Sequence, residues 1–162
     1  MLLSLLPSIL VLGVAALAAA LLAQRRLSSP DNVKQRSAAS QLLATATVIQ
    51  GIHFTEEATT GFPERLGALL GIPAMPMSFF VIFNLLWLAI WVVSVPGIRS
   101  ARTGAFFAAW FLAIAGMFNA IAHPLLAVAA NGYFPGLVTS PFIGVAGFWL
   151  WLRLRNATRT SR

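Results

Sequence analysis

The stretch His53-Phe54-Thr55-Glu56-Glu57 gathers three ionisable side chains within five residues of a very apolar sequence. Only 9% of the 162 residues are charged; His53 is one of two histidines, and Glu56 and Glu57 are two of four acidic residues. Side chains three and four positions apart share one face of an α-helix, so both glutamates are predicted to lie beside His53. An imidazole with two carboxylates can bind a divalent metal ion or transfer protons.

A second polar group, Asn119 and His123, stands in a later apolar stretch and contains the other histidine. The two residues are four positions apart, so their side chains stack along one helix face. Ionisable side chains within a membrane are costly and are by default expected to be functional. Two simpler explanations stay open: the His53 group could be a solvated helix end, and Asn119 and His123 could make a structural hydrogen bond between helices.

Long apolar stretches set the framework that must position these residues. Hydrophobic residues make up 59% of the chain, and about twenty apolar residues suffice to cross a bilayer as a helix. We predict an all-α polytopic membrane protein, a single-domain bundle of five transmembrane helices. The predicted spans cover residues 2–23, 38–60, 75–95, 104–124 and 137–152, with a short interfacial helix over 63–70.

The basic residues lie between these stretches, and their distribution predicts the orientation. Lysine and arginine are enriched in cytoplasmic segments of membrane proteins. From first to last, the segments that connect the predicted spans have positive, neutral, positive and neutral net charge, and the C-terminal tail is positive. This pattern places the N-terminus outside and the C-terminus in the cytoplasm. The segments counted as cytoplasmic carry Arg25, Arg26, Lys34 and Arg36; then Arg99 and Arg102; then Arg153, Arg155, Arg159 and Arg162.

Composition also excludes several classes of function. The net charge of +7 is spread between apolar stretches and does not form the basic patch of a nucleic-acid-binding module, so we expect membrane lipids and no nucleic acid as partners. The chain has no cysteine, which excludes disulfides, thiolate nucleophiles and Cys-ligated metals. The first apolar stretch lacks a basic residue before it and is read as a retained span rather than a signal peptide.

Prolines predict where helices end or bend, and small residues predict where helices pack closely. Pro96 is expected to end the third helix at residue 95, and Pro124 to kink or break the fourth, because proline removes a helical hydrogen bond. A broken helix at membrane depth is tolerated where it lines a cavity. Ser140, Gly144 and Gly147 give the fifth helix a small-residue face suited to close packing.

The two polar groups are predicted to lie at the same depth. His53 and Glu57 lie 15 and 19 residues beyond Ala38, and Asn119 and His123 lie 15 and 19 beyond Gly104. At 1.5 Å per residue, both pairs stand about 22–28 Å above the cytoplasmic edge, in the outer part of a hydrocarbon core of about 30 Å. Further polar residues expected to line the same cavity are Gln50, Asn84, Tyr133 and Ser140.

The five-residue stretch that begins at His53 resembles the signature of the HXXEE family, small bacterial and archaeal membrane proteins named for this motif. Asn119, His123 and residues 133–136 (Tyr-Phe-Pro-Gly) also resemble positions that recur in that family. The resemblance covers the chain from the second span to the fifth. It implies a multi-pass protein of the cell membrane, in bacteria the inner membrane. The family has no settled activity, so the resemblance implies a site without a reaction.

Two enzymatic interpretations follow from the candidate catalytic residues His53, Glu56, Glu57, Asn119 and His123. In the first, His53, Glu57 and His123 bind a divalent metal ion, which activates water for hydrolysis. In the second, no metal is bound, and the adjacent glutamates supply one acid and one base for an isomerisation. An outward-facing site suggests a lipid or another apolar molecule as substrate.

Two likenesses in chemistry bear on these alternatives. The emopamil-binding sterol isomerases are similar in being small helical membrane proteins with His and Glu in a lipid-facing cavity. Paired glutamates with a separate His and Asn also resemble the CAAX-protease-like hydrolases, but Gly61 stands where their companion arginine is expected, which ranks that likeness lower. Non-enzymatic binding or transport of a small molecule or ion also stays open, although no inverted repeat is visible.

Overall fold

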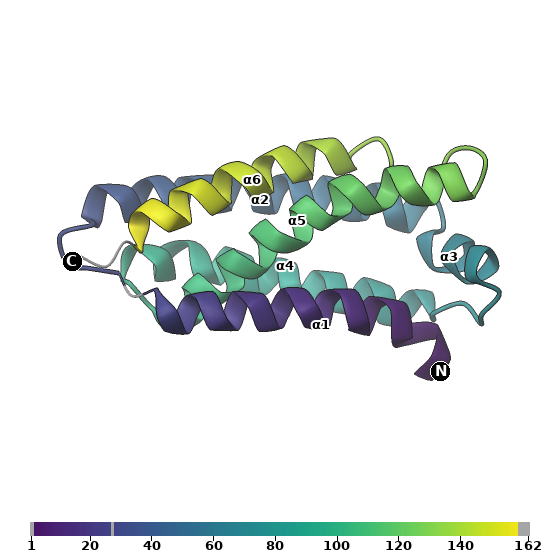
Figure 1. The fold of residues 1–162 in the computed structure, drawn as a ribbon, viewed down its shortest axis with the longest axis horizontal. Helices are drawn as coiled ribbons and strands as arrows, with labels where there is room; N and C mark the ends of the chain where they lie inside the picture. Colours follow the sequence, from purple (N-terminus) through teal and green to yellow (C-terminus); the bar gives the residue numbers. More distant parts are fainter. Residues whose placement is uncertain (1, 27, 159–162) are drawn as a thin grey trace.

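The computed structural model describes residues 2–26 and 28–158, and this part of the chain is built of α-helices alone. The helices are α1 (Leu2–Arg25), α2 (Val33–Thr59), α3 (Phe62–Leu70), α4 (Met77–Arg99), α5 (Thr103–Ala129) and α6 (Ser140–Ala157). The long helices run up and down along one axis as a bundle, and the short α3 lies at one end (Figure 1). The predicted all-α fold is therefore confirmed. Arg159 and Arg162, predicted to belong to the basic tail, lie outside the described residues.

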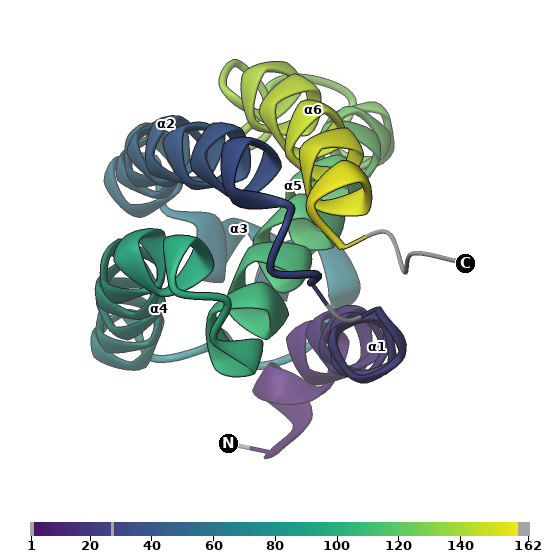
Figure 2. The same ribbon diagram turned by 90° about the vertical axis from the view of Figure 1, so that its left-hand side faces the viewer.

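Helix α5 is the element against which most of the bundle packs. It contacts α1, α4 and α6, and α2 in turn packs against α4 and α6; Figure 2 shows this arrangement along the bundle axis. Trp110, Leu112 and Ala113 of α5 are fully buried, together with Ile143 and Leu150 of α6. The fold thus fixes α2, α5 and α6, the helices that carry the predicted site, relative to one another.

The outer surface of the bundle is apolar. Large side chains such as Leu17 and Val93 are more than half exposed, as expected for a surface that faces lipid. In the described part of the chain, Leu3–Arg25, Met77–Arg99 and Thr103–Ala129 are helices long and apolar enough to cross a membrane. Three of the five predicted spans are thus supported. Helices α2 and α6 are not among them, because they carry more polar and charged residues.

Several observed helix ends differ from the predicted spans, and the differences near proline and glycine have a physical reason. Helix α4 continues through Pro96 to Arg99, and α5 continues through Pro124 to Ala129. The helix end predicted before Pro96 and a break at Pro124 are therefore wrong, whereas a kink at Pro124 stays a prediction. A proline within a helix removes only one backbone donor, and packing against neighbouring helices stabilises the remaining turns. Helix α6 begins at Ser140 rather than 137, because residues 137–139 form a turn after Gly136, whose φ is +85°.

Basic segments that are distant in sequence meet at the end of the bundle opposite α3. The buried Arg36 donates hydrogen bonds to the carbonyl oxygens of Arg99 (3.2 Å) and Ser29 (2.7 Å). Arg26 donates to the carbonyl oxygen of Arg155 (3.1 Å) and to the hydroxyl of Thr158 (3.2 Å). Guanidinium groups thus satisfy carbonyls at the C-terminal ends of α4 and α6, where positive charge is favoured by the helix dipole.

Glycines allow α6 to approach α5 closely, as the small-residue face predicts. A Cβ atom on Gly147 would lie 2.7 Å from the carbonyl oxygen of Ala113, and one on Gly116 would lie 2.8 Å from that of Ile143. We expect Gly147→Ala to lower the free energy of unfolding by about 1–3 kcal/mol through overpacking, measured by denaturant titration in detergent. Gly13→Ala in α1 is the control, because nothing lies within 4 Å of its added Cβ. An equal effect of both changes would contradict this account of the packing.

Candidate metal centre

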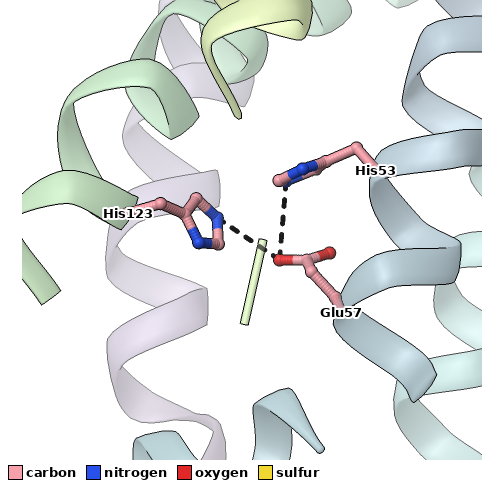
Figure 3. A group of neighbouring side chains, drawn as sticks. All are labelled: His53, Glu57 and His123. Atoms are coloured by element: carbon pink, nitrogen blue, oxygen red, sulfur yellow. Dashed lines mark ion pairs between the residues drawn. The ribbon is translucent and has the colours of Figure 1, made fainter. Parts of the chain in front are cut away.

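Helices α2 and α5 bring His53, Glu57 and His123 together near the α3 end of the bundle (Figure 3). His53 and Glu57 lie one turn apart on α2, and His123 lies on α5. Both helices run towards the same end, and each histidine lies six residues before the end of its helix, at Thr59 and Ala129. The two imidazole rings meet edge to face, with centroids 4.8 Å apart.

The three side chains converge on a common point. Glu57 Oε1 lies 3.6 Å from His53 Nε2 and 3.4 Å from His123 Nε2, and all three ligand atoms lie within 4.8 Å of one another. The residues are 0%, 7% and 2% exposed for His53, Glu57 and His123. Two ligands of a tetrahedral zinc ion, each at about 2.1 Å, are separated by about 3.4 Å. The Glu57–histidine distances therefore match a metal site.

The hydrogen bond of His123 defines which of its ring nitrogens carries the proton. Its Nδ1 lies 2.6 Å from the carbonyl oxygen of Pro135. A carbonyl oxygen can only accept a hydrogen bond, so Nδ1 is assigned as the donor. The lone pair of Nε2 then points towards Glu57. Metal-ligating histidines typically donate the N–H of the ring nitrogen that faces away from the metal to such an acceptor, which orients the imidazole.

His53 is oriented in the same sense by a chain of two hydrogen bonds. Its Nδ1 lies 2.8 Å from Thr139 Oγ1, and the Thr139 hydroxyl donates to a carboxylate oxygen of Glu56. The hydroxyl has one hydrogen, so it accepts from His53 Nδ1 while it donates to Glu56. His53 Nε2 is left as an acceptor, and the side-chain amide of Asn119 lies 3.2 Å away as its donor.

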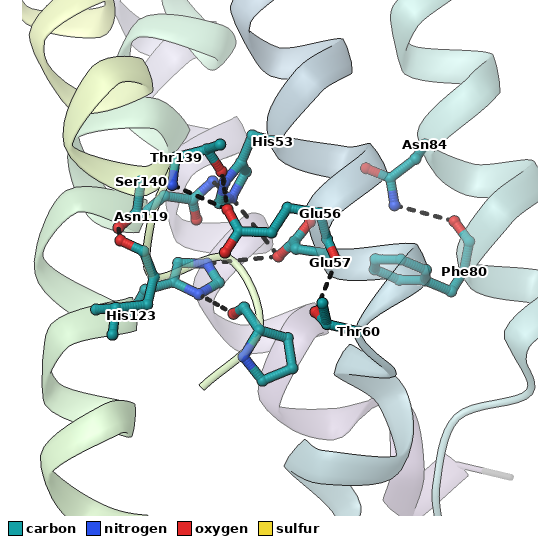
Figure 4. Close-up of polar contacts among 12 residues, drawn as sticks. His53, Glu56, Glu57, Thr60, Phe80, Asn84, Asn119, His123, Thr139 and Ser140 are labelled. Carbon is teal, nitrogen blue, oxygen red and sulfur yellow. Dashed lines mark hydrogen bonds and ion pairs between the residues drawn. The ribbon is translucent and has the colours of Figure 1, made fainter. Parts of the chain in front are cut away.

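The two adjacent glutamates have separate partners (Figure 4). Only Glu57 points towards both histidines, whereas Glu56 accepts hydrogen bonds from the backbone N–H groups of Val138 (3.1 Å) and Thr139 (2.9 Å) and from the hydroxyl of Tyr133 (2.7 Å). These donors lie in the segment that leads into α6, where a negative charge is favoured by the helix dipole. Glu56 thus ties this segment to α2 and supports His53 through Thr139.

Tyr133 provides a spectroscopic probe of this network, because it is the only tyrosine of the chain. Partial burial raises the pKa of its phenol above the ordinary value of 10.0, and the neighbouring Glu56 carboxylate raises the pKa further. We expect ultraviolet titration of tyrosinate to give a pKa above 10.0 in the native protein. Glu56→Gln should lower this pKa, since the carboxylate no longer disfavours the phenolate. An unchanged titration in that variant would contradict the contact.

The other residues predicted to line the cavity contribute less. Gln50 is buried one turn before His53, but its side chain makes no hydrogen bond within residues 2–26 and 28–158. Asn84 donates to the carbonyl oxygen of Phe80 in its own helix (2.9 Å), and Ser140 donates to that of Leu137 (3.2 Å). Neither hydrogen bond involves a histidine or glutamate of the centre.

Residues that the sequence analysis did not assign to the site complete it. Thr139 and the Pro135 carbonyl orient the imidazoles, and the ring of Phe62 in α3 lies 5.7 Å from that of His123. A Cβ on Gly136 would lie 2.6 Å from His123 Nδ1 and 2.9 Å from His53 Cε1. Thr139 stands just before the proline-containing start of α6, which is a typical cap position, but its hydroxyl makes no capping hydrogen bond and contacts His53 and Glu56 instead.

Comparison with protein family models, with curated proteins and with solved structures found no match to this chain.

Proposed function

We propose that the protein is a metal-dependent enzyme of a cell membrane, in which His53, Glu57 and His123 hold a divalent transition-metal ion. The observation that carries this proposal is the convergence of both histidine Nε2 atoms on one oxygen of Glu57. Each ring has its Nδ1 engaged by an acceptor. Three electron-rich atoms therefore face one another in a buried place, and a shared cation compensates their repulsion.

The ligand set suits specific ions. Two histidines and one glutamate bind zinc in several hydrolases, and two histidines with one carboxylate bind non-haem iron. Partners that hold the outer nitrogen of each imidazole raise affinity and fix the ring, and their loss typically costs about 10–100-fold in metal affinity. Thr139 and the Pro135 carbonyl serve in this way, and Glu56 acts through Thr139.

Hydrolysis is the reaction class that this centre supports best. A divalent ion with an open position activates a bound water as a nucleophile. The Asn119 amide donates to His53 Nε2; with that nitrogen bound to an ion, the amide would be released to hydrogen-bond to a water or to a substrate oxygen there. The centre is almost fully buried among apolar helices, and Phe62 and Phe80 stack at 5.6 Å beside it. These surroundings favour a lipid or another apolar substrate.

The topology we propose has five membrane-crossing helices, the N-terminus outside and the C-terminus in the cytoplasm. It is supported by the gathering of Arg26, Arg36 and Arg99 at the bundle end opposite α3, since positive charge favours the cytoplasmic side. The centre then lies in the outer half of the bilayer. Membership of the HXXEE family remains a proposal that rests on the motif at residues 53–57.

An acid–base reaction without metal is the second candidate, favoured by one contact. Asn119 donates to His53 Nε2 in the structure, which leaves that nitrogen as a proton acceptor beside Glu57. In such a reaction Glu57 and His53 would move a proton within an apolar substrate, as an isomerase requires. Metal dependence separates the two candidates.

The test combines metal analysis with activity in proteoliposomes. Purified protein is expected to bind close to one equivalent of zinc or iron(II), and its hydrolysis of fluorogenic lipid esters, amides and phosphodiesters should stop on chelation and return with the ion. Thr139→Val should lower metal affinity by about 10–100-fold. Metal-independent turnover of an apolar substrate would favour the acid–base reaction instead. Bound metal without turnover would favour a binding protein, and the absence of both would contradict the proposal.

A further inference from the structure

A groove of 340 Å³ runs along the surface between α2 and α6, away from the metal centre. It lies towards the basic end of the bundle: the lining residue of α2 nearest to His53 in sequence, Thr45, is eight residues before it, or about 12 Å along the helix. Its lining residues are Ala38, Gln41, Leu42, Thr45, Trp149 and Arg153. Polar and apolar side chains thus share one groove.

Two polar side chains of the groove are available to a ligand. Arg153 and Gln41 are exposed, and their side chains make no hydrogen bond or ion pair with any residue that the structure describes. Trp149 lies one turn before Arg153 on α6 and is 52% exposed. Tryptophan is enriched where bilayer headgroups meet acyl chains, and arginine is enriched on the cytoplasmic side. The guanidinium of Arg153, the indole of Trp149 and the amide of Gln41 are therefore suited to that region of a bilayer.

The charge around the groove is mostly positive. Its lining includes no acidic residue, and the other ionisable side chains at this end of the bundle are arginines and Lys34, with Asp31 as the only acid. The phosphate of any phospholipid could meet Arg153, but the ammonium of a choline or ethanolamine headgroup would find no carboxylate in the lining, so the groove favours a lipid with net negative charge. Basic pockets between helices on the cytoplasmic side bind anionic headgroups in this way.

We infer that this groove binds one anionic phospholipid, such as phosphatidylglycerol, from the cytoplasmic leaflet. The phosphate pairs with Arg153 and accepts a hydrogen bond from Gln41. An acyl chain then follows Leu42 and Trp149 towards the bilayer centre. The inference rests on the proposed crossing of the membrane by α2 and α6, and it is independent of the metal chemistry.

Native mass spectrometry of the detergent-solubilised full chain tests this inference. We expect wild type to retain one phosphatidylglycerol in preference to phosphatidylcholine. Arg153→Gln should weaken that binding about five-fold, the equivalent of about 1 kcal/mol for one basic side chain at a membrane surface. Arg155→Gln is the matched control, because it removes the same charge from the same helix two residues away and does not line the groove.

The outcomes separate this site from general attraction and from the metal centre. Equal loss of lipid in the two variants, or equal binding of phosphatidylcholine and phosphatidylglycerol, would overturn the inference. Displacement of the lipid by an equal concentration of inorganic phosphate would show an anion site rather than a lipid site and would also overturn it. Metal content should stay unchanged in Arg153→Gln, so a failure here leaves the metal centre to be tested by itself.

Discussion

Glu57→Gln is expected to abolish stoichiometric metal binding while the helical fold is kept. The amide has the size of the carboxylate but lacks its charge, and Glu57 is the residue that contacts both His53 and His123. Loss of a direct ligand should exceed the effect of losing a supporting partner, so we expect affinity to fall by more than about 100-fold. Competition with a chelator, read by the visible absorbance of cobalt(II), measures this change.

The control for this prediction is Glu64→Gln. Glu64 lies in the first turn of α3 and is exposed, so the substitution removes one glutamate charge without touching the centre. Circular dichroism should show the same helical content in both variants and in wild type. Equal cobalt affinity of Glu57→Gln and Glu64→Gln would exclude Glu57 as a ligand.

Gly136→Ala is expected to have the second largest effect, because it combines a backbone penalty with crowding of the centre. Gly136 has a φ of +85°, which costs a residue with a side chain about 1–2 kcal/mol. Its added Cβ would also press on the rings of His123 and His53. We expect lower thermal stability together with a loss of metal affinity of at least about ten-fold, the range seen when ligand orientation is disturbed.

Gly71→Ala separates these two contributions. Gly71 also has a positive φ, +65°, but nothing lies within 4 Å of a Cβ built on it. This variant should show the backbone penalty in its thermal stability and keep the cobalt affinity of wild type. If Gly136→Ala also keeps wild-type affinity, the Pro135–Gly136 segment does not hold the imidazoles in the active arrangement.

Much of the helical framework and the pairing of the histidines could be predicted from the sequence. Apolar length predicted the helices, and equal spacing along α2 and α5 predicted that His53 stands level with Asn119 and Glu57 with His123. These pairs lie 3.2 Å and 3.4 Å apart in the structure. These predictions succeed because helical rise is uniform. The helix ends at Pro96 and Pro124 were less predictable, because the outcome depends on packing against neighbouring helices rather than on the proline itself.

The different contacts of Glu56 and Glu57 could not be predicted from helical periodicity. Both residues lie three or four positions from His53, so periodicity treats them alike. What separates them is the segment from Tyr133 to Thr139, which turns back over α2 and offers Glu56 two hydroxyl and two backbone donors. The path of an irregular segment follows from tertiary contacts, so the role of Thr139 became visible only in the structure.

X-ray absorption spectroscopy of the metal-loaded protein tests the central claim most directly. Scattering beyond the first coordination sphere counts the imidazoles bound to the ion. We predict two imidazoles and one carboxylate on the ion in wild type, and one imidazole in either His53→Ala or His123→Ala. A spectrum with no imidazole, or one left unchanged by both substitutions, would contradict the assignment of His53, Glu57 and His123 as a metal centre.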